Sequence, residues 1–148
     1  MIFKITLSVS GDNFYPEEII GKIMGNFTVE SYFSPRDENM QYEYGTILFW
    51  HPKKFVLQDD IQNYENSFVE FIYINHDLFI NNGITDFSFF IEVYHNDSNC
   101  NFEVFNSENL KRIRHLNYSL PISTYRLNKK DFKKWANEIK LDWESAVE

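Results

Sequence analysis

Hydrophobic and polar residues alternate along several short segments of the chain, a spacing of two that is typical of β-strands with one buried face. The pattern is clearest at the start, where Phe3, Ile5 and Leu7 alternate with Lys4 and Thr6. The segments that fit a strand are residues 3–9, 27–33, 42–50, 87–93, 101–105 and 120–127.

Short polar loops join two pairs of these segments and predict two β-hairpins. Residues 34–39 separate the segments 27–33 and 42–50, and the polar turn at 95–99 separates 87–93 from 101–105. The last segment contains Pro121, which suits the first residues of a strand or a sheet edge because proline has no N–H to donate.

Hydrophobic residues that recur every three or four positions predict helices elsewhere. A short helix is expected at about 16–24, since Pro16 suits a first helical position and Gly25 can end the helix. A longer helix is expected from Asp59 to Phe79. Residues Phe68–Ile74 taken alone fit a strand equally well.

Two further helices are expected near the C-terminus. Ser107 can cap the first, which carries Leu110, Ile113 and Leu116. The second covers about 128–147, with Asn128 and Asp131 as its cap signal. Its hydrophobic stripe, which must be buried, consists of Phe132, Trp135, Ile139, Trp143 and Ala146 or Val147.

The order of these elements predicts an α+β fold. We expect a mixed, mainly antiparallel sheet of five or six strands with helices mostly on one face, the amphipathic C-terminal helix included. The chain has 148 residues, of which 43% are hydrophobic and 18% aromatic, enough for one core built from large rings. A single domain over residues 1–148 is therefore expected.

Cysteine usage and hydropathy bear on the compartment. Cys100 is the only cysteine, so no internal disulfide can form and a reducing compartment fits best. No apolar stretch approaches the roughly 18 residues that a membrane-spanning helix needs, and the N-terminus alternates where a signal peptide would be continuously apolar. We expect a cytoplasmic protein that does not enter a membrane.

The net charge of −8 is unevenly distributed along the chain. Residues 1–110 hold 17 acids and 5 bases, whereas residues 111–148 hold 9 bases and 5 acids. The acidic part repels phosphate backbones. Trp135 and Trp143 interleave with the basic residues but share the hydrophobic helix face, so direct nucleic-acid binding is not expected.

Two parts of the chain resemble a known family. Residues 7–14 (LSVSGDNF) lead into 16–19 (PEEI), and residues 105–110 (FNSENL) precede 120–125 (LPISTY). In these runs the chain resembles a bacterial family known as domain of unknown function 4279. The resemblance covers roughly residues 3–125, implies a fold without any chemistry, and makes the C-terminal helix an addition.

Catalytic and metal chemistry have little support in the sequence. Cys100 and His95 lie five residues apart in a predicted turn, which rarely holds a nucleophile and a base rigidly. The four histidines show no paired spacing that would bind zinc. The acidic pair Asp37-Glu38 suits a solvated loop, and the pair Asp59-Asp60 suits the start of a helix. No catalytic residue, metal or cofactor is expected.

The acidic part of the chain, residues 1–110, is a candidate surface for a basic protein partner such as a toxin domain. Immunity proteins, which cover the positive active sites of nuclease toxins, are similar in character. A non-enzymatic, immunity-type inhibitor is therefore the leading hypothesis; the alternatives are a small cytoplasmic enzyme and a structural or oligomer-forming domain. The expected contacts are Asp37, Glu38, Glu43, Asp59, Asp60 and Glu65, with Tyr42, Tyr44 or Trp50 as aromatic anchors.

Overall fold

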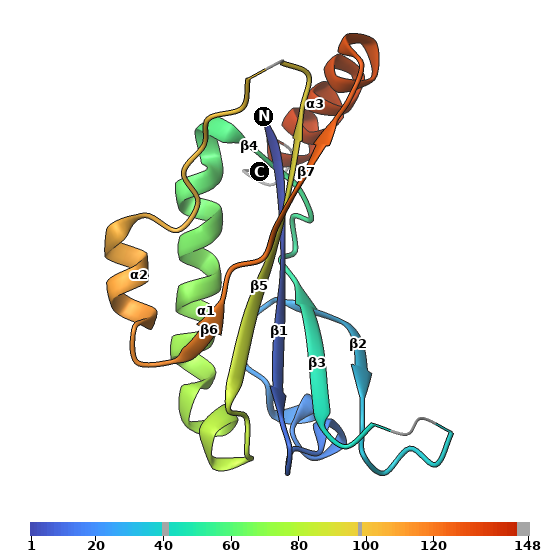
Figure 1. Ribbon diagram of the computed structural model, residues 1–148, viewed down its shortest axis with the longest axis vertical. Helices are drawn as coiled ribbons and strands as arrows, with labels where there is room; N and C mark the ends of the chain where they lie inside the picture. Colours follow the sequence, from blue (N-terminus) through green and yellow to red (C-terminus); the bar gives the residue numbers. More distant parts are fainter. Residues whose placement is uncertain (40–41, 98, 145–148) are drawn as a thin grey trace.

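The computed structural model describes residues 1–39, 42–97 and 99–144 (Figure 1). These residues form a seven-stranded mixed sheet with three α-helices and three short 3₁₀ turns. The strands are β1 (Ile2–Gly11), β2 (Thr28–Phe33), β3 (Gly45–Trp50), β4 (Val56–Leu57), β5 (Asp86–His95), β6 (Asn117–Ser119) and β7 (Ile122–Arg126). The helical segments are η1 (Pro16–Glu18), η2 (Ile20–Lys22), η3 (Gln58–Asp60), α1 (Ile61–Asn81), α2 (Ser107–Ile113) and α3 (Lys129–Glu144).

The sheet is built around β1, which pairs antiparallel with β3 and β4 on one side and with β5 on the other. β2 completes a hairpin with β3 at one edge, while β6 and β7 pair in parallel with β5 at the other. The predicted α+β fold with a mainly antiparallel sheet is confirmed. The sheet has seven strands because β4 and β6 were not predicted, whereas the predicted strand at 101–105 does not form and the segment 120–127 contains β7.

One face of the sheet and α1 form the hydrophobic core. The alternating residues Phe3, Ile5, Leu7 and Val9 are fully buried, as the spacing of two in β1 predicts. Residues Phe68–Ile74 are helical, and the strand alternative is wrong. In the helix this segment buries four hydrophobic side chains on one face, Phe68, Val69, Phe71 and Ile72, whereas a strand would divide them between two faces.

The expected helix at 16–24 is replaced by the two 3₁₀ turns η1 and η2. Asn75 of α1 fixes the end of this segment: its side-chain oxygen accepts from Met24 N (2.8 Å) and its side-chain nitrogen donates to Met24 O (2.8 Å). The Met24 N–H, which the last turn of a helix over 16–24 would direct to the carbonyl of Ile20, is thus bound by a residue 51 positions away.

The expected strand at 101–105 does not form, and the second predicted hairpin is wrong. The carboxylate of Glu65 accepts from the backbone N–H groups of Phe105 and Asn106, which draws this segment onto α1. Phe105 has a φ of 59°, a conformation that no regular strand contains. The N-cap of α2 is Asn106, whereas Ser107 was expected. The side chain of Asn106 accepts from Glu108 N and Asn109 N.

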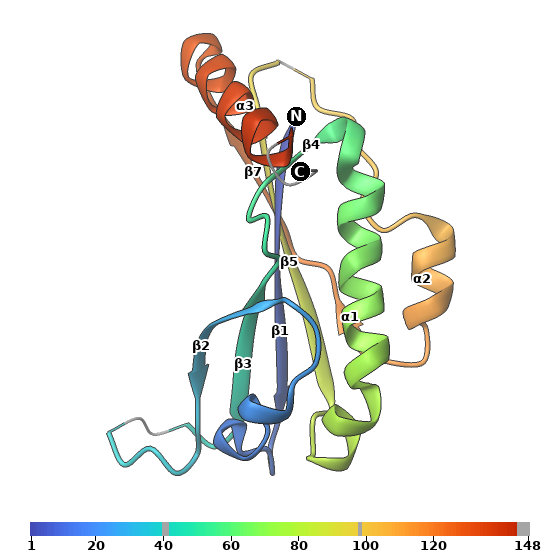
Figure 2. The ribbon, with the colours of Figure 1, turned by 180° about the vertical axis from the view of Figure 1, so that it is seen from behind.

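α3 lies on the opposite face of the sheet from α1, contrary to the expectation that the terminal helix shares the face of the others (Figures 1 and 2). Trp135 packs edge-on against Phe55 and Tyr94, with ring centroids 4.8 Å apart in both pairs. Tyr94 follows the core residue Val93, so its side chain points to the outer face. The half-buried rings of Phe55 and Tyr94 provide the hydrophobic surface on which α3 docks.

The start of α3 is capped as the sequence predicts, since Asn128 Oδ1 accepts from Asp131 N at 2.9 Å. Its hydrophobic stripe is only partly buried: Ile139 is buried, whereas Phe132 and Trp135 are half-buried. The side chain of Trp143, and residues 146 and 147, lie outside the described residues.

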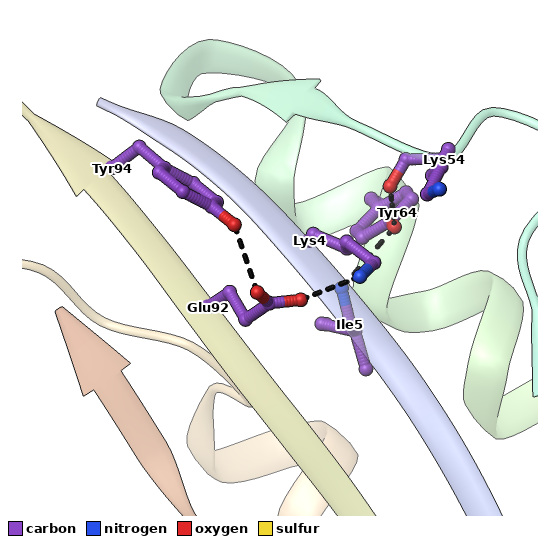
Figure 3. A network of polar contacts seen from close by, with 6 residues as sticks. All are labelled: Lys4, Ile5, Lys54, Tyr64, Glu92 and Tyr94. Atoms are coloured by element: carbon purple, nitrogen blue, oxygen red, sulfur yellow. Dashed lines mark hydrogen bonds and ion pairs between the residues drawn. The ribbon is translucent and has the colours of Figure 1, made fainter. Parts of the chain in front are cut away.

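On the side of β1 that pairs with β3 and β4, residues 4 and 5 have no strand partner, and Tyr64 of α1 bridges this gap. Its hydroxyl accepts from Ile5 N (3.3 Å) and donates to Lys54 O (2.9 Å), as Figure 3 shows. Burial raises the pKa of the Tyr64 phenol, which keeps the donating proton in place. On the outer face beside this gap, Glu92 accepts from Lys4 Nζ (2.6 Å) and from the hydroxyl of Tyr94 (2.8 Å).

Replacing Tyr64 by phenylalanine is expected to lower the free energy of unfolding by about 2 kcal/mol, because Ile5 N and Lys54 O lose their shared partner inside the protein. Urea unfolding followed by circular dichroism measures the change. Tyr73→Phe, on the exposed face of the same helix, is the matched control and is expected to change stability by less than about 0.5 kcal/mol. Equal effects of the two substitutions would contradict the bridging role.

Candidate partner-binding surface

The nine residues expected to form one contact surface lie at two ends of the sheet. Five of them, Asp37, Glu38, Tyr42, Glu43 and Tyr44, belong to the loop between β2 and β3. This loop ends where Gly45 pairs with Gly11, at the end of β1, whereas Asp59 and Asp60 of η3 follow Leu57, which pairs with Ile2 at its beginning. The ten residues of β1 separate the two groups by roughly 30 Å.

Glu65 is a structural residue rather than a contact. Only 2% of it is exposed, and its carboxylate accepts from Phe105 N, Asn106 N and the side-chain amide of Asn109. Such a carboxylate holds the segment before α2 against α1, and it has no surface to offer a partner.

Trp50 also has neighbours within the chain. Its ring is half-buried at the end of β3, with Lys54 Nζ 3.8 Å and Lys4 Nζ 5.4 Å from the ring centroid. These cation–π contacts occupy the ring that a partner was expected to use. Trp50 is therefore not placed as an anchor beside Tyr42 and Tyr44.

Three segments far apart in the sequence meet at the end of the sheet that carries the β2–β3 loop. A Cβ atom added at Gly45 would lie 2.0 Å from Phe14 O, and one added at Gly11 would lie 1.9 Å from Gly83 O. Both glycines thus permit a backbone contact that any side chain would prevent. We call the surface formed by residues 11–18, 34–39, 42–45 and 82–86 the acidic end.

The acidic end carries seven acidic side chains and a single basic one, Arg36. Arg36 is held by the chain itself, through Glu18 at 2.8 Å, Glu17 at 3.5 Å and the ring of Tyr15 at 3.8 Å from the centroid. The acidic residues are all exposed, which gives this end a negative potential. They are Asp12, Glu17, Glu18, Asp37, Glu38, Glu43 and Asp86.

Sequence reasoning identified three of these seven acidic residues and missed the other four. Glu17 and Glu18 fall in the segment that was expected to form a helix at about 16–24, and Asp12 and Asp86 have no motif around them. Strand pairing, of Ser10 with Asp86 and of Gly11 with Gly45, and the close approach of Gly45 to Phe14 bring them together.

Aromatic side chains lie within and beside the acidic end. The ring of Tyr42 is 5.2 Å from that of Phe33 and 5.9 Å from that of Tyr44. Tyr44 is 44% exposed and Tyr32 of the edge strand β2 is 50% exposed. Exposed tyrosines surrounded by charged groups are the composition of a protein-binding surface, since aromatic side chains supply most of the binding energy there.

A cluster of four lysines belongs to α3, which lies at the end of the molecule away from the β2–β3 loop (Figure 1). Lys129, Lys130, Lys133 and Lys134 of α3 are all exposed, and no ion pair to them occurs within the described ranges. These four lysines and the acidic end therefore lie at opposite ends of the sheet, and Asp59 and Asp60 of η3 lie at the same end as the lysines.

The pair Cys100 and His95 does not form a catalytic arrangement in the structure. Cys100 Sγ contacts Met1 Sδ at 3.1 Å, while His95 Nδ1 lies 3.0 Å from Asp97 O. Among the residues that the structure describes, no cluster of three or more His, Cys, Asp or Glu side chains is suited to a metal ion.

A cavity of about 350 Å³ with charged lining residues lies between α1 and α2. The rings of His76 and His115 lie 5.5 Å apart in it, but His76 contacts Asp77, and Arg112 is bound by Glu70 and Asn66. His76 and Arg112 are thus engaged by neighbouring side chains, and no serine, threonine, cysteine or lysine lies among the lining residues.

No helix within the described ranges is both long and apolar enough to cross a membrane. No family model, curated protein or solved structure matches the chain.

Proposed function

We propose that this chain is a non-enzymatic protein-binding domain that takes a basic protein at its acidic end, in the manner of an immunity protein covering a nuclease toxin. The observation that carries the proposal is the convergence of seven exposed acidic side chains with a single base that the chain itself neutralises. Such a surface attracts a cationic partner and accelerates association.

The composition of the surface supports binding to a protein rather than to a small cation. Tyr44 and Tyr32 present large exposed rings beside the carboxylates, and Tyr42 links Tyr44 to Phe33. Rings of this kind fill pockets on a partner, while the surrounding charges set orientation and exclude wrong partners. Phosphate backbones are repelled by the same charges, so the partner is a protein.

The experiment is a binding titration in which the probe is the purified product of the neighbouring gene, because a toxin and its immunity protein are normally encoded side by side. Asp37→Asn, Glu38→Gln and Glu43→Gln are combined in one variant, which is expected to slow association about 10- to 100-fold. The effect is expected to shrink as salt is raised, because ions screen exposed charges.

The matched control combines Asp77→Asn, Glu103→Gln and Glu108→Gln, three exposed acidic residues outside the acidic end. It removes the same amount of charge and is expected to alter association by less than about threefold. Equal slowing by both variants would show that net charge alone matters and would remove the acidic end as the site. Absence of binding by the unmodified chain would count against the immunity role.

A further inference from the structure

β7 forms an edge of the sheet, and one side of its backbone is unpaired. Ile91 N donates to Pro121 O (2.8 Å) and Leu127 N donates to His95 O (2.7 Å). In a parallel pair alternate residues face the neighbouring strand, so these bonds direct Ser123 and Tyr125 toward β5. The N–H and C=O groups of Ile122, Thr124 and Arg126 point away from the sheet, and no bond to them occurs within the described residues.

The opposite edge of the sheet, β2, carries two features that discourage further pairing. Its register shifts between Val29 and Ser31, which places a bulge at Glu30, and the Glu30 side chain is exposed. Bulges and charges are how natural sheets protect their edges. β7 has no bulge, since its five residues follow β5 without a register shift, and its one charged side chain is that of its last residue, Arg126.

Exposed hydrophobic side chains accompany the free edge. Ile122 is 50% exposed and Tyr125 is 42% exposed, although both belong to a strand. Phe90 of β5 is 37% exposed and falls between the pairs Ser88–Ser119 and Ile91–Ile122, so it pairs with Thr6 of β1 but has no partner on the side of β6 and β7. A free backbone with hydrophobic side chains beside it is a surface on which another strand can pair.

We propose that β7 pairs antiparallel with β7 of a second copy of this chain, across a twofold axis at Thr124. In this register Thr124 faces its own copy and Ser123 faces Tyr125, while Ile122 packs on the aliphatic stem of Arg126. No like charges stand opposite each other, so the segment is complementary to itself. The outward N–H and C=O groups of Thr124 bond reciprocally.

The separation of charge favours a second copy over a strand from another protein. A twofold axis perpendicular to the sheet sets the long axes of the two copies in opposite directions. The lysine-rich start of α3 in each copy (Lys129, Lys130, Lys133 and Lys134) then lies toward the acidic end of the other, and these opposite charges attract each other. The β2–β3 loop lies at the opposite edge of the sheet and stays open to a partner.

The test compares the mass of three proteins by light scattering and sedimentation velocity: the unmodified chain, Thr124→Pro and Thr124→Ala. Proline removes the outward N–H, which has no partner within the chain, so the fold tolerates it at an edge. The unmodified chain and Thr124→Ala are expected to dimerise, and the dimer is expected to weaken with salt. Thr124→Pro is expected to raise the dimer dissociation constant by more than about 100-fold.

A monomeric unmodified chain at every concentration would overturn the proposal, even if a strand from another protein bound the edge. A dimer that persists unchanged in folded Thr124→Pro would also overturn it, because another surface would then be in use. Hydrogen exchange on the unmodified chain gives a second measurement. The amides of Ile122, Thr124 and Arg126 are expected to be protected at high concentration and to lose protection on dilution, and exchange that is independent of concentration would contradict pairing.

Discussion

Replacing Glu65 by alanine is expected to lower the free energy of unfolding by about 3–5 kcal/mol. The substitution leaves Phe105 N, Asn106 N and the side-chain amide of Asn109 without their common acceptor inside the protein, and each unsatisfied donor costs about 1–3 kcal/mol. Urea unfolding at neutral pH measures the loss. Hydrogen exchange is expected to accelerate at the amides of Phe105 and Asn106 before the sheet unfolds.

The control for this prediction is Gln62→Ala, an exposed position on the same helix, which is expected to change stability by less than about 0.5 kcal/mol. Glu65→Gln keeps one acceptor oxygen and is expected to lose about half as much as alanine, so the prediction is testable even if the alanine variant does not fold. A loss below about 1 kcal/mol in Glu65→Ala would mean that Glu65 does not hold this segment.

Replacing Gly45 by alanine is expected to lower the free energy of unfolding by about 3 kcal/mol. The added Cβ would lie 2.0 Å from Phe14 O, a backbone atom, so either β3 or the turn after β1 must move. Thermal unfolding measures the destabilisation. Because the same contact joins two segments of the acidic end, amide chemical shifts are expected to change at residues 12–18 more than along α1.

Gly21→Ala is the matched control, since a Cβ added at Gly21 meets no atom within 4 Å. This variant is expected to stay within about 1 kcal/mol of the unmodified chain, and a small gain is compatible with a less flexible unfolded state. If Gly45→Ala and Gly21→Ala behave alike, the close approach of Phe14 to β3 is not a constraint on the fold.

The sequence allowed the elements with strong periodicity to be predicted. β1, β5 and α1 each contain a repeat that is visible locally, because the core side chains recur every two or every three to four residues. The segments 16–24 and 101–105 were predicted wrongly because distant side chains determine their backbone. Asn75 binds Met24, and Glu65 binds Phe105 across 40 residues.

The candidate surface could be predicted only in part for the same physical reason. The acidic residues of the β2–β3 loop are close in sequence and were identified, but Glu17, Glu18 and Asp86 join them through strand pairing and the contacts of Gly11 and Gly45. Glu65 was wrongly expected to contact a partner, because its burial depends on residues 105–109, which lie about 40 positions later in the chain. Charge in the sequence indicates how many acidic residues exist, not which of them share a surface.

We propose that the acidic end is the surface at which this chain binds a protein partner. The most direct measurement replaces Tyr44 by a photoreactive phenylalanine in the living source cell, with the same replacement at Tyr73 as a comparison. The two tyrosines are similarly exposed, at 44% and 59%, but Tyr73 lies on α1. Light is expected to link a basic protein to position 44 and not to position 73. An acidic protein linked at position 44, equal products from both positions, or no product from position 44 would contradict this binding site.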